Sequence, residues 1–248
     1  MTTIEPTAAA AGPGGSTGPL ALVGSGEYTE AMLEVERSLL DGRPSRYVQI
    51  PTAAGKEGPK RLSYWVELGR AQAARLGVEA VPLVVTQRAQ ADDPAIVAQI
   101  AGAGLIYLSG GSPAVLADTL RDTALWRAIV AAWHSGAALA GCSAGAMALA
   151  DQVPDLRDPA GSGGRGLGLL PHLRVLPHFD KMLGWIPDVL TRPFFRPAAG
   201  VSLVGIDEDT AIVGGPEDFA VHGRQSAWLL GEGRRQQFPA GTQLHFPR

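Results

Sequence analysis

Apolar runs and amphipathic stretches alternate over residues 20–141 of the chain. Strands are predicted where a short run is mostly apolar, at residues 20–27, 45–55, 78–85, 104–113 and 137–141. Helices are predicted where apolar residues recur three or four apart, at residues 28–40, 60–77, 93–103 and 114–136, the last as one helix or two. Strands that alternate with helices form βαβ units, so we expect an α/β domain around a mainly parallel sheet.

The pattern changes after residue 150. Asp, Pro and Gly are frequent in residues 151–170, which predicts a long loop. Strand character returns at 173–180, and residues 201–215 and 219–230 predict further strands joined by tight turns, an antiparallel finish to the same domain. No internal repeat or strong linker interrupts the chain, so we expect a single domain over residues 19–248.

Residues 1–18 have the composition of a flexible tail, rich in Ala, Gly, Pro, Ser and Thr. They lack the basic start and the apolar core of a secretory signal. No apolar stretch of the chain is long and uninterrupted enough to span a membrane. We therefore expect a cytoplasmic protein without a membrane partner.

Composition and charge narrow the classes of function. A hydrophobic content of 46% with 18% charged residues indicates a packed globular protein rather than a disordered one. The net charge is −3 and no basic run is present, which argues against nucleic acid as a partner. The single cysteine, Cys142, excludes an internal disulfide and a multi-cysteine metal site. We expect no cofactor and no metal.

Three glycine-containing turns follow predicted strands, at Gly24–Glu27, Ser109–Pro113 and Gly141–Gly145. Ligands of parallel α/β sheets bind beyond the carboxyl ends of the strands. Because the strands are expected to be parallel, the three turns should lie together on one edge of the sheet. That edge is where we expect the chemistry.

The last of these turns, Gly141-Cys142-Ser143-Ala144-Gly145, fits the pattern G-x-S-x-G. A sharp strand-to-helix turn of this kind presents the serine hydroxyl at the sheet edge, and small neighbours let the backbones pass. The N–H of Ala144 would begin a helix and point to a developing oxyanion. The alternative is a plain junction packed with small residues. Cys142, the rival nucleophile, is expected to point into the core as a small hydrophobe.

A nucleophilic serine needs a base, and the chain has five histidines. His134 ends a predicted helix, His172 lies in a turn, His222 lies in a predicted hairpin and His245 lies near the C-terminus. His178 differs because it ends a predicted strand at the edge expected to carry the serine. We therefore favour His178 as the base.

These motifs together resemble peptidase family S51, the serine peptidases that include dipeptidase E and cyanophycinase. The matching segments run in order over residues 20–215: LVGSGE, VQIPTAAG, IYLSGGSP, AGCSAGAMAL, GLGLLPHLRVLPHFD and GIDEDTAIV. The resemblance implies a three-layer α/β sandwich with a mainly parallel central sheet, of the class I glutamine amidotransferase-like (flavodoxin-like) type. It also implies a serine-type peptidase of the omega-peptidase or exopeptidase kind that acts on a small peptide, such as an aspartyl dipeptide or a cyanophycin-like one.

Carried over onto this sequence, the resemblance makes Ser143 the nucleophile and His178 the general base. It makes the backbone N–H groups of Gly111 and Ala144 the oxyanion donors. The hydroxyl would attack an amide carbonyl to form an acyl-enzyme, which water would then hydrolyse.

The acid that orients the histidine is less well defined. In the family it comes from the loop between serine and histidine, which favours Asp158, with Asp155 second and Asp151 also in the interval. Asp180, two residues after the histidine, is a further option. The segment DEDT (207–210) is interpreted as a turn between strands that lines the site, not as a metal site.

Some positions depart from the family pattern. The family often has Asn or Asp and then Gln after its Gly-Gly pair, where this chain has Ser112-Pro113. Cyanophycinases carry arginines shortly after the histidine, where this chain has Lys181. These departures put a preference for acidic substrates in doubt, although Lys181, Arg192 or Arg196 could supply a charge for one.

Three other functions stay open at this point. The chain could be an α/β-hydrolase esterase, with His222 or His245 as the base. It could be a cysteine amidotransferase that uses Cys142, or a non-catalytic, amidotransferase-like binding protein. The sequence does not fix the oligomeric state, and a homodimer also stays open.

Overall fold

A computed structural model describes residues 17–153, 164–182, 199–231 and 234–247. Its central sheet has eight strands in the order β14-β11-β10-β1-β5-β4-β2-β3. The parallel strands are β1 (Leu20–Val23), β2 (Arg46–Ile50), β3 (Glu79–Pro82), β4 (Leu105–Leu108) and β5 (Ala138–Cys142). The antiparallel strands are β10 (Thr210–Gly214), β11 (Asp218–Gly223) and β14 (Gln243–His245). The predicted mainly parallel sheet is therefore confirmed.

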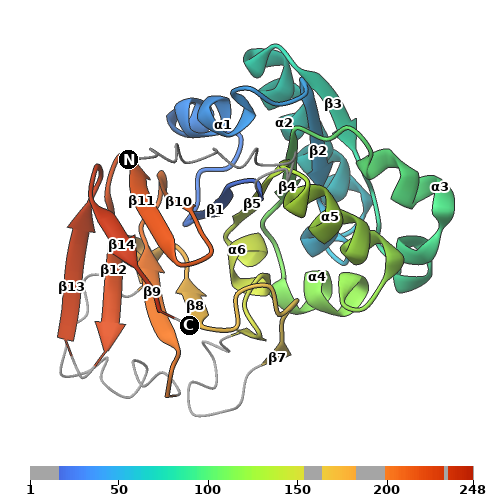
Figure 1. Cartoon of the computed structure of the whole chain (residues 1–248). Coiled ribbons are helices and arrows are strands. Elements are labelled where there is room, and N and C mark those ends of the chain that lie inside the picture. The colour runs from blue at the N-terminus through green and yellow to red at the C-terminus, as the bar shows by residue number, and fades with distance from the viewer. Residues whose placement is uncertain (1–16, 154–163, 183–198, 232–233, 248) are drawn as a thin grey trace, which may run out of the picture.

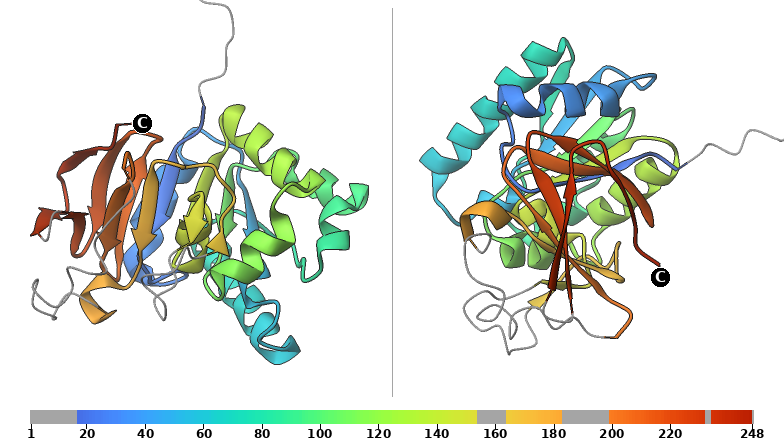
Figure 2. Two further views of the ribbon diagram at one scale, coloured as in Figure 1. Left: turned by 90° about the horizontal axis from the view of Figure 1, so that it is seen from below. Right: turned by 90° about the vertical axis from the view of Figure 1, so that its left-hand side faces the viewer.

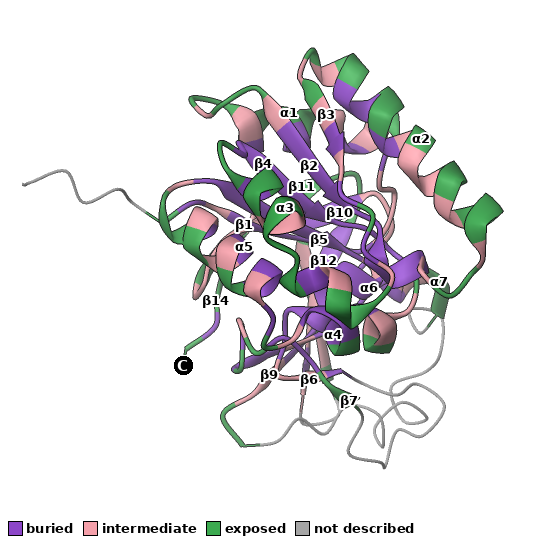
Figure 3. Ribbon diagram, turned by 90° about the vertical axis from the view of Figure 1, so that its right-hand side faces the viewer, coloured by how far each residue is buried: buried purple, intermediate pink, exposed green. Residues whose placement is uncertain are grey.

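Helices cover both faces of this sheet and bury their apolar sides against it (Figure 3). One face carries α1 (Leu33–Leu40) and α2 (Pro59–Leu76). The other carries α3 (Pro94–Val97), α4 (Pro113–Leu120), α5 (Ala124–His134) and α6 (Ala144–Ala148). Short 3-10 helices lie at Glu30–Met32, Thr52–Ala54, Arg88–Asp92 and Ala98–Ile100. The arrangement is the expected three-layer sandwich, and the region 114–136 holds two helices.

A second sheet stands beside the first, with the order β13-β12-β9-β8 (Figures 1 and 2). Its strands are β8 (Leu173–Leu176), β9 (Ser202–Ile206), β12 (Ser226–Gly231) and β13 (Arg234–Pro239). β8 and β9 are parallel, and the other pairs are antiparallel. Residues of both sheets belong to one hydrophobic core, in which Val175 and Val204 share a cluster with Leu20 and Ile212.

The strands predicted near the C-terminus are present, but they do not extend a single sheet. The chain alternates, with β9 and β12 in the second sheet and β10 and β11 in the central one. An alternating pattern predicts that a segment is a strand, but it does not identify the strand's partner. The predicted loop over 151–170 contains a small hairpin of β6 (Gln152–Val153) and β7 (Gly164–Arg165), and α7 (Phe179–Met182) follows β8.

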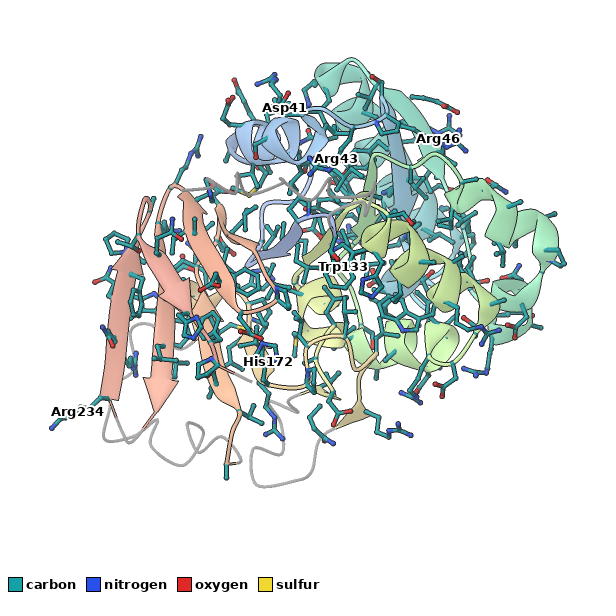
Figure 4. All side chains as sticks on the ribbon, viewed as in Figure 1. Asp41, Arg43, Arg46, Trp133, His172 and Arg234 are labelled. Carbon is teal, nitrogen blue, oxygen red and sulfur yellow. The ribbon has the colours of Figure 1, made fainter. Side chains whose placement is uncertain are left out.

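Gly18, at the end of the segment 1–18 predicted as a tail, is held against α5. Residues 1–16 lie outside the described residues, but Gly18 is fixed by two hydrogen bonds. Its N–H donates to the Trp133 carbonyl at 2.8 Å, and the Trp133 indole N–H donates to its carbonyl at 2.7 Å (Figure 4). Across the described parts of the chain, no helix is both long and apolar enough to cross a membrane.

Candidate active site

Ser143 lies at the turn between β5 and α6, with φ 50° and ψ −109°. A positive φ is strained for a residue with a side chain. The turn is sharp enough that a Cβ on Gly141 would lie 2.6 Å from the Gly145 backbone, and a Cβ on Gly145 would lie 2.2 Å from the Leu108 carbonyl oxygen. Both glycines are therefore required by close backbone approach. The serine itself is half-buried, at the expected edge of the sheet.

Ser143, His178 and Glu208 form a line of hydrogen bonds. Ser143 Oγ lies 3.0 Å from His178 Nε2, and His178 Nδ1 lies 3.1 Å from Glu208 Oε1. An ionised carboxylate only accepts, so the ring proton belongs on Nδ1 and Nε2 is left to accept from the hydroxyl. This is the geometry in which a histidine removes a proton from a serine and a carboxylate stabilises the resulting imidazolium.

The second sheet brings His178 and Glu208 together. β8 and β9 are parallel neighbours, and Leu176 pairs with Gly205. The chain therefore leaves both strands at the same end, with His178 beyond one and Glu208 beyond the other. The His178 N–H donates to the Gly24 carbonyl at 3.3 Å, which ties this end to the first turn of the central sheet.

Side chains and backbone groups fix the turn that carries Glu208. Asp180 Oδ1 accepts the Glu208 N–H at 2.9 Å. Gln225 Nε2 donates to Asp180 Oδ2 at 3.3 Å and to the Glu208 carbonyl at 2.9 Å. The preceding residue, Asp207, is buried and accepts the Trp228 indole N–H at 2.9 Å; burial raises its pKa. Asp180 thus binds the turn that carries the acid, rather than the imidazole.

The acid next to the imidazole differs from the one favoured by the sequence. Asp158 and Asp155 lie outside the described residues, and Asp151 contacts the loop through its carbonyl, which accepts the Gly166 N–H at 2.7 Å. The segment 207–210 does form a turn that lines the site, but the sequence pattern did not single out its Glu208 as a candidate. The available signal was that a polar residue lies two positions beyond each of two strands, His178 after 173–176 and Glu208 after 202–206.

Two backbone N–H groups are free to bind an oxyanion. Ala144 is the first residue of α6, so its N–H has no partner within the helix. Gly111 is exposed and has φ 135°. In the described parts of the chain, neither N–H donates a hydrogen bond, whereas the Gly110 N–H donates to Glu27 and the Ser112 N–H donates to a carbonyl.

Cys142 is fully buried, as expected, and its thiol donates to Glu27 Oε2 at 2.8 Å. Burial raises the pKa of this thiol, and the charge of Glu27 raises it further. The reactive form of a cysteine is the thiolate. A buried thiol that is held protonated is poorly suited to be the nucleophile, which favours Ser143.

The other histidines occupy positions away from this line. His134 ends α5, and His172 is buried and donates through Nε2 to the Pro216 carbonyl at 2.9 Å (Figure 4). His222 is exposed on β11, and His245 on β14 lies 2.8 Å from Asp218. All five histidines lie in the described residues, and of these only His178 hydrogen-bonds to Ser143, so the esterase alternative lacks its base. No group of three or more His, Cys, Asp or Glu among those residues could hold a metal ion.

A serine at a strained strand-to-helix turn, on a three-layer α/β sandwich, is typical of serine-type hydrolases. The model of peptidase family S51 matches residues 20–221. The crystal structure of a peptidase from an acI-B1 Actinobacterium is 44% identical, with a TM-score of 0.85, over 94% of this chain and 98% of that one. The chain therefore belongs to peptidase family S51, and it is a serine peptidase.

A more distant structure agrees in fold. A protein assigned as a peptidase E from Listeria monocytogenes EGD-e has a TM-score of 0.58 and 19% identity, over 84% of this chain and 98% of that one. At that identity the likeness concerns the fold alone. No curated protein matches the sequence.

Proposed function

We propose that the protein hydrolyses an amide bond of a small peptide through an acyl-enzyme on Ser143. The observation that carries the proposal is the unbroken line from Ser143 Oγ to His178 Nε2 at 3.0 Å and from His178 Nδ1 to Glu208 Oε1 at 3.1 Å. Each residue has the partner that its role needs: the nucleophile has a base, and the base has a carboxylate.

The reaction follows from these contacts. The Ser143 hydroxyl oxygen attacks the amide carbonyl carbon while His178 Nε2 takes its proton. The N–H groups of Gly111 and Ala144 stabilise the oxyanion, each by about 2.7–4 kcal/mol. His178 then gives its proton to the leaving amine as the C–N bond breaks. Water, activated by the same histidine, hydrolyses the ester and restores Ser143.

A small peptide is the expected substrate, whereas a preference for an acidic side chain has little support. Ser112, which replaces the Asn or Asp of the family, caps α4, because its hydroxyl accepts the Val115 N–H at 3.4 Å and Pro113 begins the helix. Lys181 is exposed, and Arg192 and Arg196 lie outside the described residues. We therefore propose a peptidase of broader or different specificity than an aspartyl dipeptidase.

The test combines a chemical label with a substrate screen. A fluorophosphonate should modify Ser143, and a library containing Asp-X, β-Asp-Arg and neutral dipeptides should reveal hydrolysis. Ser143→Ala should abolish both the labelling and the hydrolysis without changing the unfolding transition. Ser135→Ala, at an exposed serine beyond α5, should retain both. Hydrolysis that survives in purified Ser143→Ala protein would show that another group is the nucleophile.

A further inference from the structure

The carboxylate of Glu27 lies between the turn that carries Gly111 and the residue that precedes Ser143. Its Oε1 accepts the Gly110 N–H at 2.9 Å, and its Oε2 accepts the Cys142 thiol at 2.8 Å. The side chain is half-buried. Because both oxygens are held, the carboxylate stays beside the nucleophile.

The space between this carboxylate and the serine contains no side chain from residue 110. A Cβ on Gly110 would lie 2.4 Å from Glu27 Oε1 and 3.5 Å from Ser143 Cβ. A Cβ at this position would therefore contact both groups, so Glu27 Oε1 and Ser143 Cβ lie near each other. Gly110 leaves the carboxylate and the nucleophile side by side.

The negative charge of Glu27 has no cation beside it. Among the described residues, no lysine, arginine or histidine forms an ion pair with it. Its two hydrogen-bond donors are neutral, and an ionised carboxylate has about four lone-pair sites, so it can still accept. The raised pKa of Cys142 keeps that thiol a neutral donor. The charge is left for something that binds at the site.

We propose that Glu27 binds the free α-ammonium group of the residue whose carbonyl carbon Ser143 attacks. This inference rests on the proposed function and deepens it. In a peptide with a free N-terminus, the α-ammonium is two bonds from the carbonyl carbon of the first residue. An anion beside both the nucleophile and the Gly111 turn is therefore within its reach. Glu27 is thus assigned as the residue that selects, among small peptides, those with an unblocked amino end.

Glu27 also disfavours substrates that lack this cation. A negative charge next to the oxyanion donors opposes the negative charge that develops in the transition state. A bound ammonium group cancels that effect, whereas an N-acetyl group leaves it in place and loses the charged hydrogen bond. The predicted preference for free over N-acetylated substrates is about 10- to 150-fold, the range of a hydrogen bond to a charged group.

The kinetic test compares free and N-acetylated aminoacyl p-nitroanilides of alanine, leucine, lysine and aspartate. The parent should favour the free amines in kcat/KM. Glu27→Gln keeps the shape and an acceptor for the Gly110 N–H but removes the charge, so it should bring the two classes to within about threefold of each other. The loss should fall on the free amines, mainly in KM. Glu30→Gln, at an exposed residue on the same stretch, is the matched control and should keep the preference.

A role for Glu27 in only shaping the Gly110 turn predicts a different result. Glu27→Gln would then lower kcat for both classes equally and slow the fluorophosphonate labelling of Ser143, which would overturn the proposal. An equal preference of the parent for free and N-acetylated substrates would also overturn it.

A binding measurement makes the outcome independent of turnover. Calorimetry should show that the Ser143→Ala protein binds alanyl-alanine. The same protein should bind N-acetyl-alanyl-alanine about 10- to 150-fold more weakly. Adding Glu27→Gln should remove the difference, and equal binding before that change would reject the role of Glu27. A parent that hydrolyses nothing and is not labelled would refute the proposed function, while this binding difference would still test Glu27.

Discussion

The proposed nucleophile, Ser143, and the proposed base, His178, come from two regions that are built in different ways. Ser143 lies on the central sheet, and crossing backbones at Gly141 and Gly145 fix its position. His178 and Glu208 stand on turns of the second sheet, with side chains 32% and 34% exposed, and hydrogen bonds between side chains and turns hold them. Backbone packing thus positions Ser143, whereas a polar network positions His178 and Glu208.

One short turn joins the two regions. The Gly24 carbonyl accepts the His178 N–H, and the Ser25 carbonyl accepts the Asp209 N–H at 3.2 Å. At the end of β1, just before this turn, the Val23 carbonyl accepts the Ser143 N–H at 2.9 Å. Changes on the side of the second sheet should therefore alter activity with little effect on stability. Changes in the packed backbone around Ser143 should alter stability.

Among changes near the second sheet, Glu208→Gln should have the largest effect on activity. A neutral amide cannot stabilise the imidazolium and can hold the wrong tautomer, so kcat should fall about 10³- to 10⁴-fold. The unfolding transition should change little, because the side chain is partly exposed. Steady-state kinetics on the best dipeptide, with urea unfolding of the same preparation, measures both quantities.

Asp158→Asn is the matched control for this variant, since the sequence alone favours that residue. Activity within about twofold of the parent would agree with Glu208 as the acid. If Asp158→Asn loses as much activity as is expected for Glu208→Gln, and Glu208→Gln remains active, the assignment drawn from the structure is wrong.

Glu36→Gln should have the next largest effect, which is a change in the stability of the folded state rather than in activity. Glu36 lies on α1 with 1% of its surface exposed, and burial raises the pKa of its carboxyl from 4.5 to about 8, while the neighbouring Gln72 side chain and the charge of Arg75 lower it. The folded state therefore binds this proton more tightly than the unfolded state. The resulting stability is complete below pH 4.5, declines as the pH rises and is lost by about pH 8.

The glutamine variant should lack this decline, so it should be more stable than the parent by a few kcal/mol at pH 8, because each pKa unit is worth about 1.4 kcal/mol. Urea unfolding at several pH values between 5 and 8.5 measures the difference. Glu34→Gln, at an exposed residue of the same helix, should keep the parent's slope. Equal slopes for the parent and Glu36→Gln would contradict the buried, protonated carboxyl.

The difference between the two regions also explains what could be predicted from the sequence. The pattern Gly141–Gly145 is local: a predicted strand precedes it and a helix follows, so the residue pattern alone is enough to place the turn and Ser143. Local signals also place the end of α2, where Gly77 has φ 73°, and the N-cap Asp93, which accepts the Ala95 N–H. Each of these features depends on neighbours within a few residues.

The acid could not be placed in this way, because its partner lies 30 residues away in sequence. Glu208 reaches His178 only because β9 pairs in parallel with β8 in a separate sheet. The alternation of 201–215 predicts strands but not this partner, and a hairpin is the simpler interpretation. Long-range pairing is set by the packing of whole sheets, and a single sequence carries little direct signal of it.

Asp180→Ala should give the smallest effect, and it tests how the polar network acts. The alanine removes the acceptor of the Glu208 N–H and a partner of Gln225, so the turn should hold Glu208 less firmly. We expect kcat to fall about tenfold with KM nearly unchanged, because about one hydrogen bond that positions Glu208 is lost. Asp180→Asn keeps an acceptor and should restore most of the activity.

Asp180 is a positioning residue, so its effect should pass through Glu208 alone. The double variant Asp180→Ala/Glu208→Gln should then be no less active than Glu208→Gln, because the network has nothing left to position. Losses that multiply in the double variant would mean that Asp180 affects the reaction by a separate route. The activity would then depend on groups beyond the hydrogen bonds from Ser143 through His178 to Glu208. The contrast between Ser143, positioned by backbone packing, and His178, positioned by a polar network, would weaken.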